Sequence, residues 1–388
     1  MTETNNSVAP IRVAFVLHNM QVAGAEMLVA ATIRRLRSLI DPVILCLDGL
    51  GSLAESLNME GVPVVNLGRR PGFDLKVSLR VAAEVRVRRC EVVHAHQYTP
   101  FTYAALAKPF TGFRYHLMFT EHGRHYPDVV SRKRYWSNRI FLSSLADEVN
   151  AVCEFSSRSL KEVEGFLRAA IEIIPNGIEL ANYNLPGSAV SCKAALGLDQ
   201  KKRHIACIAR FHPVKGHATL IQAFSDIARL KDDVDLLLVG GGPLRDSLEQ
   251  QAKSLGIAGR VHFMGIRKDV PAILQATDIF VLSSISEAAS LTLLEAMASS
   301  VPVVVTDVGG NGEIVRNGVE GLLAPRGDAP GIARACLELL SDPDRASAMG
   351  LKGRARVEQC FQLKNTIDEY YRRYEAAANK LRNNGSRI

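Results

Sequence analysis

The sequence predicts an α/β protein of two domains, each built on a doubly wound parallel sheet. Its 388 residues exceed the roughly 250 to 300 residues at which a single hydrophobic core stops growing. Short β-branched runs alternate with helix-periodic segments along the chain, which is the pattern of βαβ units. A stretch rich in Pro and Gly interrupts this pattern near Gly177 and separates two such regions.

The expected strands are apolar on both faces, as a parallel sheet with helices on both sides requires. In the first half they are IRVAFVL, VILCL, VPVVNL, EVVHAH and YHLMFT, at 11–17, 43–47, 62–67, 91–96 and 115–120. In the second half they are HIACIA, DLLLVG, VHFMG, IFVLSS and VPVVVTD, at 204–209, 235–240, 261–265, 279–284 and 301–307. Ligands of such sheets bind beyond the carboxyl ends of the strands, so two facing sheets would enclose a cleft lined by the loops that follow them.

The domain boundary is expected near Gly177, within IIPNGIELANYNLPGSAV. This gives an N-terminal domain of residues 1–177 and a C-terminal domain of residues 178–360. Residues 361–388 follow as a helix and tail, because FQLKNTIDEYYRRYEAAANK is strongly helix-periodic. The tyrosines of this helix are expected to pack on a neighbouring surface.

Composition restricts the class of protein. Hydrophobic residues make up 47% and charged residues 22% of the chain, which is typical of globular domains, and no window holds the roughly 20 apolar residues of a membrane span. The polar start MTETNNSVAP does not have the pattern of a secretory signal. The seven cysteines show neither zinc-type spacing nor a disulfide framework, so we expect reduced cysteines in a cytoplasmic protein.

The net charge of +7 is concentrated between Arg69 and Arg139. This segment has 14 Lys and Arg against 5 Asp and Glu, so it favours an anion or forms a solvated basic face. The anion could be nucleic acid, an anionic lipid surface or a phosphorylated substrate. With 6% aromatic residues and no nucleic-acid motif, we expect no nucleic acid. Within SRKRYWSNRIFLSSLADEV, cations alternate with Trp136 and Phe141 at near-helical spacing, which predicts a helix docked on an anionic membrane surface or an ordinary helix lining the cleft.

Two glutamates follow a strand in SSISEAASLTLLEAMASS. Glu287 lies in a loop, and Glu295 lies in the second turn of a helix that begins near Ser290. Glu295 sits among apolar residues, so its charge needs a partner, which a hydroxyl-rich ligand would supply. The free amides of Ser290, Leu291 and Thr292, together with the helix dipole, form a site for a phosphate. The alternative is an Ala-rich core helix with a capping serine and an incidental glutamate.

Cations and glycines follow two other strands of the second half. In IARFHPVKGH, Arg210 and Lys215 flank a turn after a strand, which suits a diphosphate whose negative charge grows as it departs. In LVGGGPL, Gly241 lies in a run of three glycines that either lets a ligand approach the backbone or forms a tight turn before a helix. Neither motif is decisive alone, since surface cations and glycine turns are common.

The first half offers candidates at three strand ends. Gly24 lies at a loop-to-helix junction in HNMQVAGAEMLV, where a backbone amide can reach an anionic group. His96 and His122 end two strands, which places their side chains for a site rather than for the core. His94 alternates to the opposite face from Ala95 and is expected to be structural. His122 and Arg124 are weaker candidates for binding an acceptor.

These motifs resemble, in the same order, those of glycosyltransferase family 4. The resemblance rests on the glutamate pair with its LLEAMA helix, RFHPVKG, VGGGPL, VHFMG, PVVVTDVGG followed by Glu313, the IPNGIE hinge and the GAE loop, and it covers nearly the whole chain. It implies a GT-B fold, in which two Rossmann-like domains face each other across a cleft and a C-terminal helix crosses back to the first domain. It also implies retention of anomeric configuration and no required metal or other cofactor.

The resemblance assigns roles to the second-domain residues. Glu295 is implied to hold the ribose of a nucleotide donor, and Glu287 is implied to contact the transferred sugar. Arg210 and Lys215 are implied to hold the diphosphate together with the amides of 290–292.

The first domain matches the family less closely. Gly24 is implied to approach the diphosphate, His96 matches a family histidine beside the sugar and acceptor, and His122 is a looser match. The usual Gly-Gly pair is Ala23-Gly24 here, and the frequent Gly after the first glutamate is Ala288. Both departures concern the identity of the sugar.

The sequence therefore predicts a glycosyltransferase that moves a hexosyl group from a nucleoside-diphosphate sugar to an acceptor hydroxyl. A lipid-linked saccharide of a bacterial surface polysaccharide is the expected acceptor, and a cytoplasmic protein attached peripherally to the inner membrane face is expected. Two alternatives stay open. One is a sugar-nucleotide epimerase or phosphorylase of GT-B-like fold with the same diphosphate grip. The other is a nonenzymatic basic anion-binding protein, which explains the charge but not the second domain.

Overall fold

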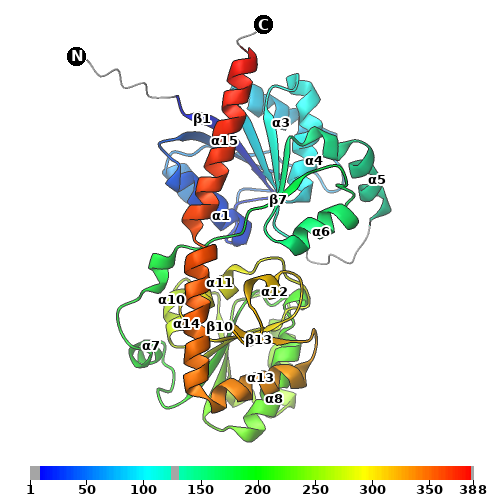
Figure 1. The fold of residues 1–388 in the computed structure, drawn as a ribbon. Coiled ribbons are helices and arrows are strands. Elements are labelled where there is room, and N and C mark those ends of the chain that lie inside the picture. The colour runs from blue at the N-terminus through cyan, green and yellow to red at the C-terminus, as the bar shows by residue number, and fades with distance from the viewer. Residues whose placement is uncertain (1–8, 124–130, 386–388) are drawn as a thin grey trace, which may run out of the picture. The chain divides into compact units, whose positions relative to one another are not determined.

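The chain folds into two compact units, each with its own parallel sheet (Figure 1). This confirms the predicted α/β architecture of two doubly wound domains. The computed structural model describes residues 9–123 and 131–385. Of these, unit 1 contains 9–123, 131–174 and 366–385, and unit 2 contains 175–365.

Unit 1 is built on a seven-stranded sheet in the order β3-β2-β1-β4-β5-β6-β7, with every neighbouring pair parallel. The strand order reverses direction between β1 and β4. The short strands β6 and β7 were not among the expected strands. The strands are β1 (Ile11–Leu17), β2 (Ile40–Cys46), β3 (Val64–Asn66), β4 (Val92–His96), β5 (His116–Glu121), β6 (Glu148–Ala151) and β7 (Ile171–Ile173).

The sheet of unit 1 is buried on both faces. Alternate side chains of a strand point to opposite faces. In β1, Ala14 and Val16 therefore belong to a core that includes residues of α3 and α4, whereas Phe15 faces the other side, with its ring centroid 6.3 Å from that of Tyr374 in α15. The helices are α1 (Gly24–Arg35), α2 (Ser52–Met59), α3 (Leu75–Val87), α4 (Tyr98–Ala107), α5 (Arg132–Ile140), α6 (Glu154–Glu162) and α15 (Leu363–Gly385).

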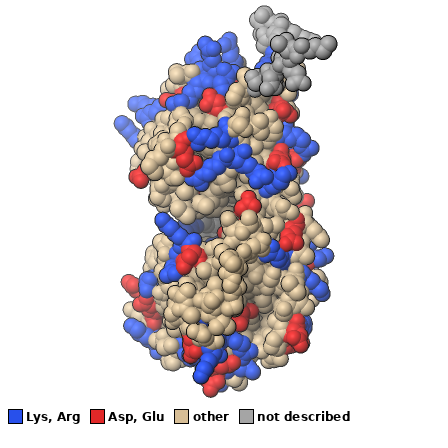
Figure 2. All heavy atoms as spheres, turned by 90° about the vertical axis from the view of Figure 1, so that its left-hand side faces the viewer, with Lys and Arg blue, Asp and Glu red and all other residues tan. Residues whose placement is uncertain are grey.

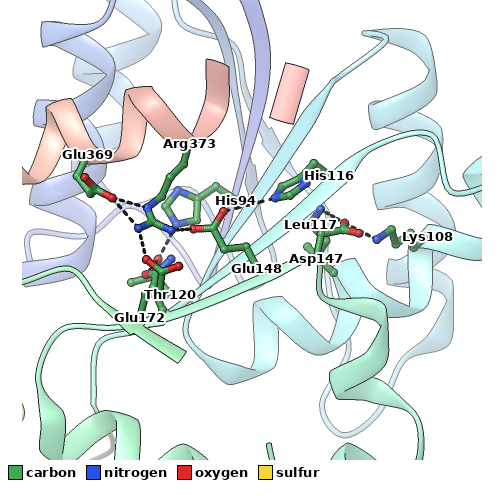
Figure 3. Close-up of polar contacts among 11 residues, drawn as sticks. His94, Lys108, His116, Leu117, Thr120, Asp147, Glu148, Glu172, Glu369 and Arg373 are labelled. Atoms are coloured by element: carbon green, nitrogen blue, oxygen red, sulfur yellow. Dashed lines mark hydrogen bonds and ion pairs between the residues drawn. The ribbon is translucent and has the colours of Figure 1, made fainter. Parts of the chain in front are cut away.

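The C-terminal helix α15, red in Figure 1, packs on unit 1 through polar as well as apolar contacts. The hydroxyl of Tyr374 lies 2.6 Å from Nδ1 of His94, and both side chains are fully buried. The guanidinium of Arg373 is enclosed by three carboxylates, which come from β6, β7 and α15 itself: Glu148, Glu172 and Glu369 (Figure 3). The predicted packing of this helix through its tyrosines is thus present for Tyr370 and Tyr374, which are 1% and 0% exposed.

Replacing Arg373 with methionine is expected to loosen α15 from unit 1. The Arg373 side chain is 16% exposed, and its loss removes the cation shared by the carboxylates of Glu148 and Glu369, which are 18% and 23% exposed. The expected loss of the free energy that holds α15 on unit 1 lies between about 1 kcal/mol, as for an exposed ion pair, and about 3 kcal/mol, as for a buried one. Amide hydrogen exchange along α15 measures it. Arg372→Met is the matched control, since Arg372 is 72% exposed and pairs with Glu369; equal exchange in both variants would contradict the prediction.

Unit 2 is built on a six-stranded parallel sheet in the order β10-β9-β8-β11-β12-β13. Its strand order reverses between β8 and β11. The four-residue strand β13 was not among the expected strands. The strands are β8 (Arg203–Ile208), β9 (Val234–Val239), β10 (Val261–Gly265), β11 (Ile279–Leu282), β12 (Val303–Thr306) and β13 (Gly321–Ala324).

Helices cover both faces of this second sheet as well. Val281 and Val304 belong to a core with α8 and α13, and their neighbours Phe280 and Val305 belong to a second core with α10 and α11. The single helical turns η3 (Leu180–Tyr183) and η4 (Pro213–Lys215) lie in loops. The helices are α7 (Ala189–Ala195), α8 (His217–Leu230), α9 (Arg245–Ser254), α10 (Val270–Gln275), α11 (Leu291–Ala298), α12 (Asn311–Ile314), α13 (Ala329–Ser341) and α14 (Pro343–Cys360).

The two connections to unit 1 leave unit 2 from adjacent backbone. Ile178 pairs with Gln362 in a parallel bridge flanked by backbone hydrogen bonds of 3.0 and 2.9 Å. A Cβ at Gly177 would lie 2.5 Å from backbone atoms of Gln362, so the close approach requires glycine. The units divide after Ile174 and before Thr366. The expected boundaries were after residue 177 and after residue 360.

No helix in the described part of the chain is both long and apolar enough to span a bilayer. None of the seven cysteines, all of which lie in the described residues, forms a disulfide, and six of them are buried or partly buried. Burial raises the pKa of Cys46, Cys90 and Cys207 to about 12, which keeps these thiols protonated at neutral pH.

Candidate functional site

The residues singled out in the sequence gather where the strand order reverses. In unit 2 the loop after β8 carries Arg210 and Lys215, and the loop after the neighbouring strand β11 carries Glu287. In unit 1 the chain beyond β1 leads to Gly24, and the neighbouring strand β4 ends at His96. Loops that leave adjacent strands in opposite directions form a crevice at the carboxyl edge, which is where open α/β sheets bind ligands. Each unit therefore has one candidate site at the carboxyl edge of its sheet.

An ion pair joins the two central loops of unit 2. Nζ of Lys215 lies 2.5 Å from Oε1 of Glu287, and the Ser284 hydroxyl donates to the same oxygen at 2.7 Å. The side chains of Lys215 and Glu287 are 19% and 8% exposed. A backbone hydrogen bond of 2.7 Å from Ile285 to Val214 also links the loops. The pair holds one cation at a fixed place beside the strand ends.

Glycines allow these loops to approach closely enough to fix the pair. Gly309 has a φ of +57°, and a Cβ there would lie 1.6 Å from the carbonyl oxygen of Glu287. The N–H of Gly310 donates to that same oxygen at 3.1 Å. Gly216, with a φ of +63°, would place a Cβ 2.1 Å from the carbonyl oxygen of Ser283. The position of Glu287 is therefore set by backbone contacts from a neighbouring strand loop.

Helix α11 begins with backbone amides that its N-cap serine does not bind. The hydroxyl of Ser290 lies 3.1 Å from that of Thr292 and makes no capping hydrogen bond to the backbone. The first-turn amides of Leu291 and Thr292 therefore retain the partial positive charge of a helix N-terminus. Such an end binds phosphate oxygens.

Glu295 lies in the second turn of α11 and has a partner that the sequence did not reveal. The hydroxyl of Tyr183, at the end of η3, donates to its carboxylate. Burial raises the pKa of Glu295 from 4.5 to about 7, and the hydrogen bond from Tyr183 opposes this rise. Near neutral pH the carboxyl group is therefore partly protonated.

Replacing Glu295 with glutamine is expected to flatten the dependence of stability on pH. The raised pKa of Glu295 means that the folded protein holds a proton that the unfolded chain releases above pH 4.5. The stability from this proton is fully present below pH 4.5 and is lost as pH rises through about 7, by at most about 3 kcal/mol. Denaturant midpoints of unit 2 at pH 5 and pH 8 measure the difference. If the denaturant midpoint falls as much between pH 5 and pH 8 in Glu295→Gln as in the wild type, a group other than Glu295 causes the pH dependence.

The run of three glycines after β9 mainly serves contact between loops. A Cβ at Gly240 would lie 2.1 Å from the carbonyl oxygen of Ala209, and one at Gly242 would lie 2.6 Å from that of Phe211. Gly241 is different, because a Cβ there would meet only the side chain of Ile266 at 3.1 Å. The interpretation as a tight turn thus holds for the outer glycines, and the donor-binding role of Gly241 stays a prediction. Arg210 is exposed on the loop that this turn supports.

A pair of histidines lies at the carboxyl edge of unit 1. Nδ1 of His96 lies 2.8 Å from Nε2 of His122, and the rings stack with centroids 5.1 Å apart. Burial lowers the pKa of His96 well below 6.5 and that of His122 to about 4, so both are neutral at pH 7. Nε2 of His96 is buried and has no hydrogen-bond partner within the described residues. The hydrogen-bonding capacity of this nitrogen is therefore unused among the described residues.

His94 is structural, as its position in β4 predicted. Its Nε2 lies 2.6 Å from the Thr120 hydroxyl, which itself donates to Oδ1 of Asn150 (Figure 3 shows the first contact). Thr120 must then accept from His94, which leaves Nδ1 of His94 to accept from Tyr374. Both ring nitrogens are used, so His94 has no capacity left for a substrate.

The other first-unit candidates are less defined. Gly24 is the first residue of α1, after Ala23 in an extended conformation without a side-chain cap. Arg124 lies outside the described residues. Within the described residues, no group of three or more His, Cys, Asp or Glu side chains is arranged to hold a metal ion.

The basic segment is partly neutralised by acidic residues from elsewhere in unit 1. Arg69 pairs with Asp48, and Lys108 pairs with Asp147. On the face drawn in Figure 2, which is the left-hand side of Figure 1, Lys and Arg gather on unit 1, whereas the two signs alternate on unit 2.

Family models and a curated relative match the chain. The model for "Glycosyl transferases group 1" matches residues 192–356, and that for "Glycosyltransferase Family 4" matches residues 22–182. The N-acetyl-alpha-D-glucosaminyl L-malate synthase of Bacillus anthracis is 30% identical over 304 residues, which cover 77% of this chain and 78% of that protein. The chain belongs to glycosyltransferase family 4. It is therefore a glycosyltransferase.

Other similar proteins support the same family and fold. The lipopolysaccharide core biosynthesis mannosyltransferase LpsB of Rhizobium meliloti is 28% identical over 285 residues, covering 71% of this glycosyltransferase and 76% of LpsB. The crystal structure of Anabaena HepE in complex with UDP and glucose superposes with a TM-score of 0.83 at 22% identity, covering 94% and 99% of the two chains. WaaG superposes with a TM-score of 0.72 at 16% identity, covering 92% and 98%. The fold is GT-B.

Sequence reasoning missed three residues that shape the candidate site in unit 2 of this glycosyltransferase. Ser284 bonds Glu287, Gly309 supports its backbone, and Tyr183 bonds Glu295. The glycine pair after β12 was a usable signal, because paired glycines at a strand end often mark close backbone approach. No local pattern connects Tyr183 with Glu295.

Proposed function

We propose that this glycosyltransferase moves a hexosyl group from a nucleoside-diphosphate sugar to an acceptor hydroxyl with retention of configuration. The observation that carries the proposal is the Lys215–Glu287 pair, on a loop that leads into the uncapped first turn of α11. A fixed cation and a helix N-terminus suit a diphosphate. A buried carboxylate suits sugar hydroxyls.

Each residue then has a role in the transfer. The acceptor oxygen bonds to the anomeric carbon, and the bond from that carbon to the diphosphate oxygen breaks, with its electron pair going to the diphosphate. Lys215, Arg210 and the amides of 290–292 stabilise this growing charge. Glu287 orients the sugar and Glu295 holds the ribose. The hydroxyl proton passes to the departing diphosphate.

Further roles belong to unit 1. Gly24 would approach the diphosphate, and the free Nε2 of His96 would bind a hydroxyl of the sugar or acceptor. His122 would hold His96 in place rather than contact the acceptor directly, since its Nε2 bonds His96. We assign no covalent intermediate and no metal to the reaction. Full activity in a chelator is the expected result.

The nucleotide base is left to experiment, because similar proteins differ in it. A GDP-mannose-dependent mannosyltransferase of Mycolicibacterium smegmatis is 34% identical over 196 residues, covering 48% of this chain and 51% of that protein. HepE has also been crystallised with UDP-glucose. For the acceptor we propose a lipid-linked saccharide of a surface polysaccharide, which the similarity to LpsB favours.

We also propose that unit 1 docks on an anionic membrane surface from the cytoplasmic side. In and beside α5, the apolar side chains of Trp136, Ile140 and Phe141 are 53%, 72% and 48% exposed. Arg132 and Lys133 are exposed on the same helix. Apolar side chains mixed with cations are typical of an interfacial helix.

A nucleotide panel followed by product analysis tests the function. UDP or GDP is expected to raise the melting temperature of the protein in proportion to the logarithm of its concentration. Incubation of the matching nucleotide sugar with acceptor should then yield glycoside and free nucleoside diphosphate. Epimerised nucleotide sugar, or sugar phosphate made from inorganic phosphate, would show a different reaction.

A further inference from the structure

A cavity of about 720 Å³ lies within unit 1. It is enclosed by the loop before α3, by α4, and by α5 with the turn that follows it. Its volume falls in the roughly 300 to 1,000 Å³ range of small-molecule sites. None of the described residues that line it is Asp or Glu.

The cavity is cationic and aromatic at one end. Arg69 comes from the loop that follows β3, and Tyr98 is the first residue of α4, directly after β4. Lys133 and Arg134 belong to the first turn of α5, which leads from β5 to β6 and so starts toward the carboxyl edge of the sheet. These residues place the charged end of the cavity at the edge that carries His96.

The other end is apolar. Leu106 lies near the end of α4, about 12 Å along the helix from Tyr98. Ile140 ends α5 and Phe141 follows it, and these side chains are 72% and 48% exposed although they line a concave site. Large apolar side chains gathered in one exposed hollow usually mark a binding surface.

Lys133 is the cation best placed to meet an anion. Arg69 forms two hydrogen bonds to Asp48, and Arg134 pairs with Glu164 at 3.2 Å while stacking 3.7 Å above the Tyr98 ring. For Lys133, by contrast, no ion pair is found among the described residues. The charged end therefore carries positive charge that the described residues of unit 1 do not neutralise.

We propose that this cavity binds a single lipid phosphate, with its phosphate at Lys133 and its hydrocarbon chain running along α4 toward Leu106 and Ile140. The occupant follows from charge complementarity, because one end offers a cation beside aromatic rings and the other offers only apolar contact. This proposal rests on the proposed function and makes its acceptor more specific. It names an isoprenoid-type or alkyl phosphate as the anchor that delivers an acceptor sugar to the edge at His96.

The single tryptophan of the chain provides a direct readout, because Trp136 lines the cavity. Titration of the full-length protein with farnesyl phosphate below its micellar concentration is expected to shift the Trp136 emission to the blue in a saturable way. Farnesol, which has the chain but no phosphate, should bind at least about tenfold more weakly. Inorganic phosphate, which has no chain, should give no shift.

Two variants locate the ligand. Lys133→Glu is expected to remove the preference for farnesyl phosphate over farnesol, whereas Lys161→Glu on the exposed face of α6 should keep it. Leu106→Phe shortens the apolar end, so it should weaken farnesyl phosphate more than geranyl phosphate, which is one isoprene unit shorter. Lys133, Lys161 and Leu106 have no role in the proposed donor site. The rise in melting temperature on nucleotide binding therefore serves as a folding control for all three variants.

Two results would overturn the proposal. One is an emission shift that requires anionic phosphatidylglycerol vesicles and is absent with monomeric farnesyl phosphate, which would assign the same face to a bilayer surface. The other is equal binding of farnesyl phosphate by Lys133→Glu, Leu106→Phe and the control Lys161→Glu. In either case, sugar transfer to a soluble acceptor would still stand, so failure of the lipid site and failure of glycosyl transfer are separable.

Discussion

Lys215→Ala is expected to lower kcat for sugar transfer at least about tenfold, because a charge-assisted contact to the departing diphosphate contributes roughly 1.5 to 3 kcal/mol. The structure strengthens this expectation. Lys215 is only 19% exposed and lies 2.5 Å from Glu287, so its ammonium group is already positioned before the donor binds. Initial rates at saturating donor measure the effect.

The control for Lys215 is Lys253→Ala, which removes an exposed lysine of α9 in the same unit and should leave the rate unchanged. Removal of Lys215 also leaves the carboxylate of Glu287 without its cation. A double-mutant cycle with Glu287→Gln separates this from catalysis, since contacting residues are not additive. Wild-type kcat in Lys215→Ala would remove the proposed mechanism.

Gly309→Ala is expected to destabilise unit 2 by about 3 kcal/mol or more and to abolish transfer. Its Cβ would lie 1.6 Å from the carbonyl oxygen of Glu287, and backbone cannot yield as a flexible side chain can. Either the loop after β11 or the loop after β12 must move. Movement of the first loop displaces Glu287 from Lys215, and movement of the second breaks the hydrogen bond from Gly310 that holds the Glu287 backbone. Melting temperature and transfer rate together measure the two effects.

Gly327→Ala is the matched control for Gly309→Ala. Gly327 has a φ of +75°, close to the +57° of Gly309, but no atom lies within 4 Å of a Cβ placed there. It therefore incurs only the backbone strain of a left-handed alanine, about 1 kcal/mol. If both variants lose the same stability and keep the same transfer rate, the contact of Gly309 with Glu287 is not needed for function.

Much of the fold could be predicted because parallel strands buried on both faces have a distinctive sequence pattern. The apolar runs at 11–17 and 204–209 correspond to β1 and β8, the central strands of the two sheets. The strands missed were short ones away from the centre, such as β7 and β13, with three and four residues. Such strands carry too few residues for periodicity to distinguish them from loops.

The candidate site also has features that the sequence indicates and features that depend on tertiary contacts. Glu287, Lys215 and Ser290 could be singled out as candidates from sequence because each follows a recognisable strand, and strand ends meet at one edge of a sheet. The histidine pair was found only in part. That His96 and His122 contact each other depends on the pairing of β4 with β5, which puts His96 opposite Thr120.

By itself, the sequence determined that two helix-covered sheets form, and which loops carry cations, carboxylates and glycines, because these properties are local. The tertiary structure decided which of those groups touch. It paired Lys215 with Glu287, gave Glu295 the hydroxyl of Tyr183, and used both nitrogens of His94 within the core. It also formed the cavity in unit 1, since a cavity arises from the packing of helices that no local pattern records.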